Sequence, residues 1–184
     1  MKRIILFAVL AGFTFLVHAQ STEFHAFKVD FGVGYASPSQ GNTVAGGTFT
    51  LQPHYRLSND FALGLRVEAA AILYKNGSGQ KQGSAIASGC LTGEFYLSDG
   101  GFRPFIGAGV GPYDQATISG NNGSGNGGGP NVSPRVINFG AFPELGFEAG
   151  HFRFSVEYDA TGGYNNYFAV KIGTFFGGGR KPKK

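Results

Sequence analysis

Eight stretches of the chain alternate apolar and polar side chains with a period of two residues. In the first stretch Phe27, Val29 and Phe31 share one face, while Lys28 and Asp30 share the other. Because successive side chains of a β-strand point to opposite faces, this alternation predicts strands with one apolar and one polar face. The eight predicted strands are Phe27 to Tyr35, Val44 to Leu57, Phe61 to Leu73, Ser84 to Leu97, Phe102 to Pro112, about Ile137 to Ala149, Phe152 to Asp159 and Phe168 to Phe176.

The connections between these strands are expected to alternate in length. Tight turns follow the second, fourth and sixth strands, at 58–60, 98–101 and 150–151. Longer segments rich in Gly, Asn and Ser follow the others, and Gly120 to Asn131 is predicted to be a mobile outer loop. Short periplasmic turns and longer outer loops are typical of bacterial barrels. The sequence therefore predicts an all-β fold, an eight-stranded antiparallel up-and-down transmembrane β-barrel, with both termini in the periplasm.

The charges within the strands decide which face is inside. Six bases and seven acids lie on the polar faces and nearly cancel. Eight strands leave a lumen about as wide as packed side chains, and buried charges are tolerated when they are paired. Gly107, Gly109 and Gly111 form one row that leaves room for large side chains opposite. The expected lumen charge network is Lys28, Asp30, Arg56, Arg66, Glu68, Glu94, Arg103, Glu144, Glu148, Arg153, Glu157, Asp159 and Lys171.

The apolar face would then meet lipid. It is aromatic near the strand ends, as the interfacial girdles of membrane barrels are. These aromatic residues are Phe27, Tyr35, Tyr55, Phe61, Phe95, Phe152, Tyr158, Phe168 and Phe176. Two alternatives stay open: a soluble, secreted lipocalin-like barrel that binds a small apolar ligand, and a narrow outer-membrane channel.

The first residues have the three regions of a secretory signal peptide. Lys2 and Arg3 precede an apolar stretch from Ile4 to Val17, and small residues flank His18 at 17–19. The apolar stretch is shorter than the ~20 residues that a spanning helix needs. We therefore expect Sec-type export with cleavage after residue 19, a barrel domain over 20–176, a basic periplasmic tail over 177–184, and a location in the outer membrane.

The charge of the chain argues against a nucleic-acid partner. The net charge is +4, and the tail residues Arg180, Lys181, Lys183 and Lys184 supply four positive charges. The rest of the chain is near neutral, so no basic surface for nucleic acid is expected, and the tail is predicted to be solvated. The sole cysteine, Cys90, excludes an internal disulfide and is expected to be a small, inert, inward side chain.

No constellation of residues indicates catalysis. The topology places His25 and His151 at the periplasmic end and His54 in the lower half of the second strand, away from the outer leaflet. No catalytic residue, no cofactor and no metal site is predicted. Three matches to an N-glycosylation acceptor, at 76–78, 122–124 and 131–133, arise from the Asn, Gly and Ser content of the loops.

Two segments resemble a known family. Arg103 to Gly111, with the sequence RPFIGAGVG, is similar to the recurrent Pro-aromatic-x-Gly-x-Gly strand of small outer-membrane barrels typified by the OmpA transmembrane domain and OmpX. Lys171 to Gly177 resembles part of their closing strand, although Phe176 does not end the chain. The resemblance, over about Phe24 to Phe176, implies a structural, adhesive or envelope-stabilising role without catalytic residues. It also implies outer-membrane lipid, lipopolysaccharide and, through the C-terminal strand, the outer-membrane assembly machinery as partners; it names no ligand for the loops.

Overall fold

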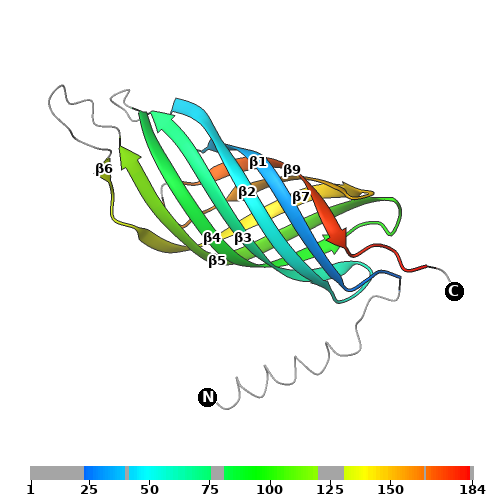
Figure 1. Cartoon of the computed structure of the whole chain (residues 1–184). Coiled ribbons are helices and arrows are strands. Elements are labelled where there is room, and N and C mark those ends of the chain that lie inside the picture. Colours follow the sequence, from blue (N-terminus) through cyan, green and yellow to red (C-terminus); the bar gives the residue numbers. More distant parts are fainter. Residues whose placement is uncertain (1–22, 40–41, 76–80, 120–130, 164, 183–184) are drawn as a thin grey trace, which may run out of the picture.

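A single antiparallel β-sheet closes on itself to form a barrel (Figure 1). The computed structural model describes residues 23–39, 42–75, 81–119, 131–163 and 165–182. None of these residues forms a helix of a length and hydropathy able to cross a membrane. The strands are β1 (Phe27–Pro38), β2 (Asn42–Arg56), β3 (Phe61–Lys75), β4 (Lys81–Tyr96), β5 (Phe102–Ser119), β6 (Asn131–Val132), β7 (Val136–Ala149), β8 (Phe152–Asp159) and β9 (Tyr167–Gly177).

Eight of these strands surround the lumen. Each pairs with its neighbour along the chain, β1 pairs with β9, and β4 pairs with β5, so the sheet has no open edge around the barrel. The two-residue β6 pairs only with Ile118 and Ser119 at the end of β5 and extends one hairpin rather than adding a wall. The prediction of an eight-stranded antiparallel up-and-down barrel is therefore confirmed.

The two ends of the barrel differ. The short connections 57–60, 97–101 and 150–151 lie at one end together with residues 23–26 and 178–182; we call it the terminal end. The opposite end, where β1, β3, β5 and β8 end and β2, β4 and β9 begin, is the loop end. Gly150 has a φ of 61°, which suits it to the tight turn between β7 and β8. The predicted signal peptide and nearly all of the predicted loop 120–131 lie outside the described residues.

The start of the basic tail is exposed and also contacts the residues before β1. The amide of His25 donates to the carbonyl of Gly179 at 2.9 Å, and that of Lys181 donates to the carbonyl of Glu23 at 2.8 Å. The Arg180 guanidinium contacts the Glu23 carboxylate at 2.6 Å, and this hydrogen bond raises the pKa of Arg180. The tail pairs with the segment before β1 because both leave the barrel at the same end.

The fifth strand extends beyond its predicted end. β5 has 18 residues and continues past Pro112, where the sequence prediction ended it. Pro112 still lies opposite Phe139 of β7, and the β4–β5 register resumes at Tyr113, so the missing proline N–H interrupts one ladder only locally. β8 covers Phe152–Asp159, which is the predicted range. The predicted long connection after the first strand is also wrong, since β1 and β2 are separated only by 39–41.

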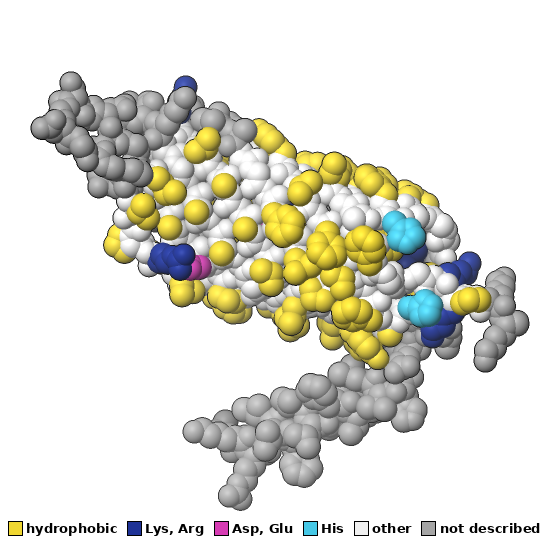
Figure 2. All heavy atoms as spheres, viewed as in Figure 1, with side chains coloured by type: hydrophobic (Ala, Val, Ile, Leu, Met, Phe, Trp, Pro, Cys, Tyr) yellow, Lys and Arg dark blue, Asp and Glu magenta, His cyan; other side chains and the backbone are white. Residues whose placement is uncertain are grey.

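The distribution of side chains is inverted relative to a soluble protein. Among the described residues, 23 polar or charged side chains are buried, against 14 apolar ones. The outward face carries large apolar side chains, such as Phe27 at 59% exposure, Leu65 at 58% and Phe139 at 73%. Figure 2 shows one wall of the barrel covered by such side chains, with His and most of the visible basic side chains gathered near the terminal end.

Candidate functional site

All thirteen charged residues predicted for the lumen are buried inside the barrel. None exposes more than 7% of its surface. They come from β1, β2, β3, β4, β5, β7, β8 and β9, because each of these strands turns its polar face inward. Across the lumen, side chains far apart in the sequence meet in two groups of ion pairs and one aromatic layer.

The loop-side cluster consists of Arg66, Glu68, Glu157, Asp159 and Lys171. The Arg66 guanidinium contacts Glu157 at 2.9 Å and Asp159 at 2.5 Å. Lys171 contacts Glu157 at 2.5 Å and also binds Glu68, which lies 3.7 Å from Arg66. Each acid therefore faces at least one base, as the near balance of charge in the sequence predicted.

Two tyrosines that the sequence analysis did not assign to the network complete this cluster. Tyr113 donates a hydrogen bond to Asp159 at 2.7 Å and accepts one from Arg66 at 3.1 Å. Tyr167 donates to Glu68 at 2.6 Å. Tyr113 follows Gly111 by two residues on the same face of β5. Continuing the alternation past Pro112 would have found it.

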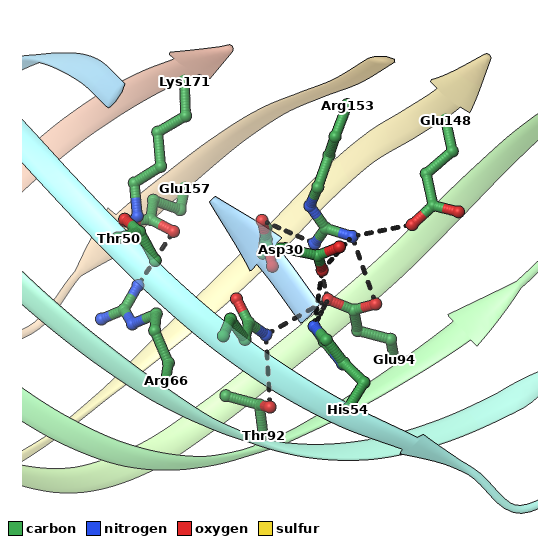
Figure 3. A network of polar contacts seen from close by, with 12 residues as sticks. Asp30, Thr50, His54, Arg66, Thr92, Glu94, Glu148, Arg153, Glu157 and Lys171 are labelled. Atoms are coloured by element: carbon green, nitrogen blue, oxygen red, sulfur yellow. Dashed lines mark hydrogen bonds and ion pairs between the residues drawn. The ribbon is translucent and has the colours of Figure 1, made fainter. Parts of the chain in front are cut away.

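The central cluster is organised by Arg153 of β8. Its guanidinium lies 2.5 Å from Glu94, 3.1 Å from both Glu144 and Glu148, and 3.4 Å from Asp30 (Figure 3). These four acids come from β4, β7 and β1. One planar guanidinium with five donors thus links three other strands across the lumen.

Lys28 and His54 complete the central cluster. Lys28 contacts Asp30 at 3.1 Å and binds Glu148. His54, which the sequence analysis placed in the lower half of the second strand, is 2% exposed and places Nε2 2.7 Å from Asp30 and 3.6 Å from Glu94. His25 and His151 are exposed at the terminal end, so the three histidines do not come together. Cys90 is buried and faces inward.

The terminal end of the lumen contains a layer of aromatic rings that contact Arg56 and Arg103. The guanidinium of Arg56 lies 4.6 Å from the ring of Phe24 and 4.7 Å from that of Tyr96, and Arg103 lies 4.2 Å from both. Arg103 also approaches Glu148 at 3.8 Å. Arg56 forms no ion pair with an acid among the described residues, unlike the other five bases of the network. Contact with two aromatic faces takes the place of the acid.

The lumen narrows at both ends. At the loop end, Gln115 donates to the carbonyl of Thr161 at 3.1 Å and accepts from Asn165 at 2.9 Å, and Thr161 is fully buried. At the terminal end, Phe24 is 3% exposed beneath Arg56 and Arg103. Between the two ion-pair clusters a cavity of about 20 Å³ remains, beside Thr50, Gln52 and Ser155. That volume accommodates about one water molecule.

Two groups of side chains have a spacing that a metal ion could use. Their ligand atoms lie within 4.8 Å of one another. The acids of each group already form ion pairs with two bases, Lys28 and Arg153 for the first group and Arg66 and Lys171 for the second. A metal ion would have to displace these bases, so the side chains present fit ion pairing. The groups are Asp30, His54 and Glu94, and Glu68, Glu157 and Asp159.

The glycine row of β5 provides the space for this packing. A Cβ atom at Gly109 would lie 2.4 Å from the ring of Phe142, and one at Gly107 would lie 3.3 Å from Glu94 Cγ. Phe142 in turn packs against Arg66, whose Cζ lies 3.4 Å from the ring centre. The glycines therefore let an aromatic ring and the ion-pair clusters fit within the same barrel.

We expect Gly109→Val to lower the free energy of unfolding by about 1 to 3 kcal/mol, as overpacking of a filled interior does. Ala108→Val is the matched control, because Ala108 is the neighbouring exposed residue on the outer wall. Urea unfolding of both variants in lipid vesicles measures the difference. Equal stabilities would mean that the lumen has room to spare at Gly109.

Comparison with known proteins places the fold. No protein-family model matches the chain, and no curated protein matches it by sequence. Three solved structures are similar over most of the chain. Neisserial surface protein A has a TM-score of 0.54 at 17% identity, covering 82% of this chain and 96% of that chain. OprG, an outer membrane protein from Pseudomonas aeruginosa, has a TM-score of 0.54 at 12% identity, covering 84% and 97%.

The third structure is Ail, the attachment invasion locus protein of Yersinia pestis, with a TM-score of 0.52 at 11% identity, covering 84% of this chain and 99% of that chain. At these identities the likeness concerns the fold. The chain has the fold of the small eight-stranded outer-membrane barrels, in agreement with the resemblance seen in its sequence.

Proposed function

We propose that this chain is an integral outer-membrane β-barrel with a closed, salt-bridged lumen, which serves a structural or surface-interaction role through the loops at its loop end. The observation that carries the proposal is the inverted distribution of side chains. All thirteen charged lumen residues are buried, while the outer wall is apolar. A soluble protein rarely exposes apolar patches beyond a few hundred Å².

The same distribution argues against the lipocalin-like alternative. A soluble barrel that binds a small apolar ligand needs an apolar interior, whereas this interior holds Arg66, Arg153 and their acidic partners. Apolar side chains gain roughly 1.5 to 3 kcal/mol each when they leave water, so a wall of them favours lipid as the surrounding solvent.

The packing of the lumen supports a structural role over transport. Eight strands enclose a space about as wide as their own side chains, and aqueous pores are found in barrels of about 16 to 18 strands. The remaining cavity between the ion-pair clusters, about 20 Å³, is far too small for a solute path. We propose no catalytic step and no cofactor for this arrangement.

The proposed surroundings follow from the barrel. Outer-membrane lipid and lipopolysaccharide would contact the apolar wall, and β9, which pairs with β1 to close the barrel, would be the strand read by the assembly machinery. The loop end would face the exterior and the terminal end the periplasm, after export directed by residues 1–19. The chemistry of a loop ligand does not follow from the described residues.

Cell fractionation tests the proposal. The chain should sediment with the outer membrane, resist extraction by salt and alkali, and dissolve only in detergent, because its outer wall is apolar. An unboiled sample should migrate differently on a denaturing gel from a boiled one, because a closed barrel resists unfolding by the detergent. Recovery in the soluble fraction without detergent would support the lipocalin-like reading instead.

A further inference from the structure

A hollow of about 540 Å³ lies on the outer wall of the barrel, over β2, β3, β4 and β5. Its volume is within the range of about 300 to 1,000 Å³ that is usual for small-molecule sites. The strand register brings small outward-facing residues from four strands side by side. One row contains Gly47, Ala71, Ala85 and Ala116, and the next contains Ala69 and Ala87.

Larger side chains border these small ones and give the hollow its depth. Along β3, Ala69 and Ala71 lie between Val67, 58% exposed, and Leu73, 53% exposed. Phe49 lies opposite Ala69 and lines the side of the hollow. The floor is thus apolar and lower than the surrounding wall.

One ion pair lies at the edge of the hollow. Arg135 and Asp114 both line it, and their charged groups are 3.3 Å apart. The side chains of Tyr113 and Gln115 are buried in the lumen, so the side chain of Asp114 between them points outward. Asp114 is the one acidic residue on the outward face of the strands described here. Figure 2 shows an acidic side chain beside a basic one on an otherwise apolar wall, away from the terminal end.

The cation of this pair remains available to a ligand. The side chain of Arg135 is 78% exposed, whereas that of Asp114 is 30% exposed. A guanidinium has five donors, and the 3.3 Å contact with Asp114 is made through Nη1. Lys75, exposed at the end of β3, adds a second positive charge on the same face above Leu73. Arg135 and Asp114 balance each other at the edge of the hollow, and Lys75 places a further positive charge beyond it, toward the loop end.

The position of the hollow along the barrel matches the expected level of the loop-side membrane surface. Ala71 follows Phe61, near the terminal end of β3, by ten residues. At ~3.3 Å per residue and a tilt of about 40°, these residues span roughly 25 Å, the height of the apolar band of outer-membrane barrels. The hollow then lies where hydrocarbon gives way to lipid headgroups on the loop side.

We propose that the hollow binds one membrane lipid of the loop-side leaflet, with an acyl chain over the alanines and a phosphorylated headgroup on Arg135. The inference rests on the membrane location proposed above. A flexible acyl chain can enter a hollow between larger side chains. A second copy of the convex barrel would bridge over the hollow. An arginine can contact a phosphate through two parallel donors, which gives the headgroup a defined place.

Native mass spectrometry of the full chain in mild detergent tests the site, with phosphatidylglycerol as the probe and diacylglycerol of the same chains as its uncharged counterpart. Ala87→Phe fills the hollow, and Ala108→Phe makes the same change elsewhere on the exposed wall. Arg135→Gln removes the cation. Asp114→Asn removes the competing acid. Barrel folding of every variant is checked by the unboiled gel.

We expect retention of phosphatidylglycerol to fall about tenfold in Ala87→Phe, which fills the hollow. We expect a similar fall in Arg135→Gln, because a tenfold change corresponds to the loss of about one charge-assisted contact. Retention should rise in Asp114→Asn, which frees the guanidinium from its acid. Diacylglycerol should respond to Ala87→Phe only. Inorganic phosphate alone should not compete, because it lacks the chain.

If Ala87→Phe and Ala108→Phe retain phosphatidylglycerol equally well, the hollow is not the binding site. If Arg135→Gln retains as much phosphatidylglycerol as the wild type, Arg135 does not bind the phosphate. Competition by inorganic phosphate would make it a simple anion site. Dimers that Ala87→Phe converts to monomers would show that a second copy occupies the hollow. Each of these outcomes, obtained with a folded barrel in the membrane, would contradict the lipid site but not the proposed function. A chain recovered soluble without detergent would instead remove the proposed function itself.

Discussion

Arg153→Ala should be among the most destabilising single substitutions in the barrel. The guanidinium lies within 3.4 Å of Asp30, Glu94, Glu144 and Glu148. Among the described residues, its removal leaves these acids with two nearby permanent cations, Lys28 beside Asp30 and Glu148, and Arg103 at 3.8 Å from Glu148. Breaking a buried ion pair from one side costs about 3 to 5 kcal/mol, less where water can enter, so we expect a loss in this range.

Urea unfolding in lipid vesicles, followed by the unboiled gel shift, measures this loss. Arg135→Ala is the matched control, because it removes the same side chain from an exposed ion pair on the wall and should change stability by no more than about 1 kcal/mol. Adding Glu94→Gln to Arg153→Ala should recover part of the stability, since it removes one uncompensated charge. Equal losses for Arg153→Ala and Arg135→Ala would show that the central cluster contributes no more than a surface pair.

The sequence alone could assign the side of the wall on which each charge lies. Alternation in a strand has a fixed period of two, so a residue such as Glu68 or Lys171 can face only one of two ways. The near balance of acids and bases then favoured pairing inside a narrow lumen. For this reason the strand count, the inward faces and the short turns of the terminal end could be predicted without a structure.

The partners of each charge could not be predicted in the same way. Arg66 of β3 meets Glu157 and Asp159 of β8 across the lumen, and this contact depends on the tilt and stagger of the strands, which alternation does not encode. Arg56 shows the limit most clearly. Its contacts with Phe24 and Tyr96 replace an acid, and Phe24 lies outside every predicted strand.

Strand ends were predicted least well. The sequence prediction ended the fifth strand at Pro112, yet β7 continues to pair there. This error concealed Tyr113 and Gln115, which contribute to the loop-side cluster and to the narrowing of the loop end. The outer hollow escaped prediction for a related reason. Ala71, Ala85 and Ala116 become neighbours only through the register of three strands.

The absence of a conducting path is the second large effect that we expect, because the proposed role depends on a closed lumen. Ions entering from the terminal end would meet Phe24, Arg56 and Arg103 before the central cluster. Those entering from the loop end would meet the hydrogen-bonded Gln115 and Thr161. The charges between them are already paired, so moving an ion through would require breaking buried ion pairs at about 3 to 5 kcal/mol each.

Single-channel recording in planar bilayers tests this central claim most directly. The purified wild-type chain, shown by the unboiled gel to be a folded barrel, should produce no steady, large conductance, while a 16- to 18-stranded porin in the same bilayers provides the positive control. Lumen substitutions such as Arg153→Ala should lower the resistance to unfolding before they open any path. Stable, porin-like steps from the folded wild-type barrel would contradict the closed lumen and favour the narrow-channel alternative.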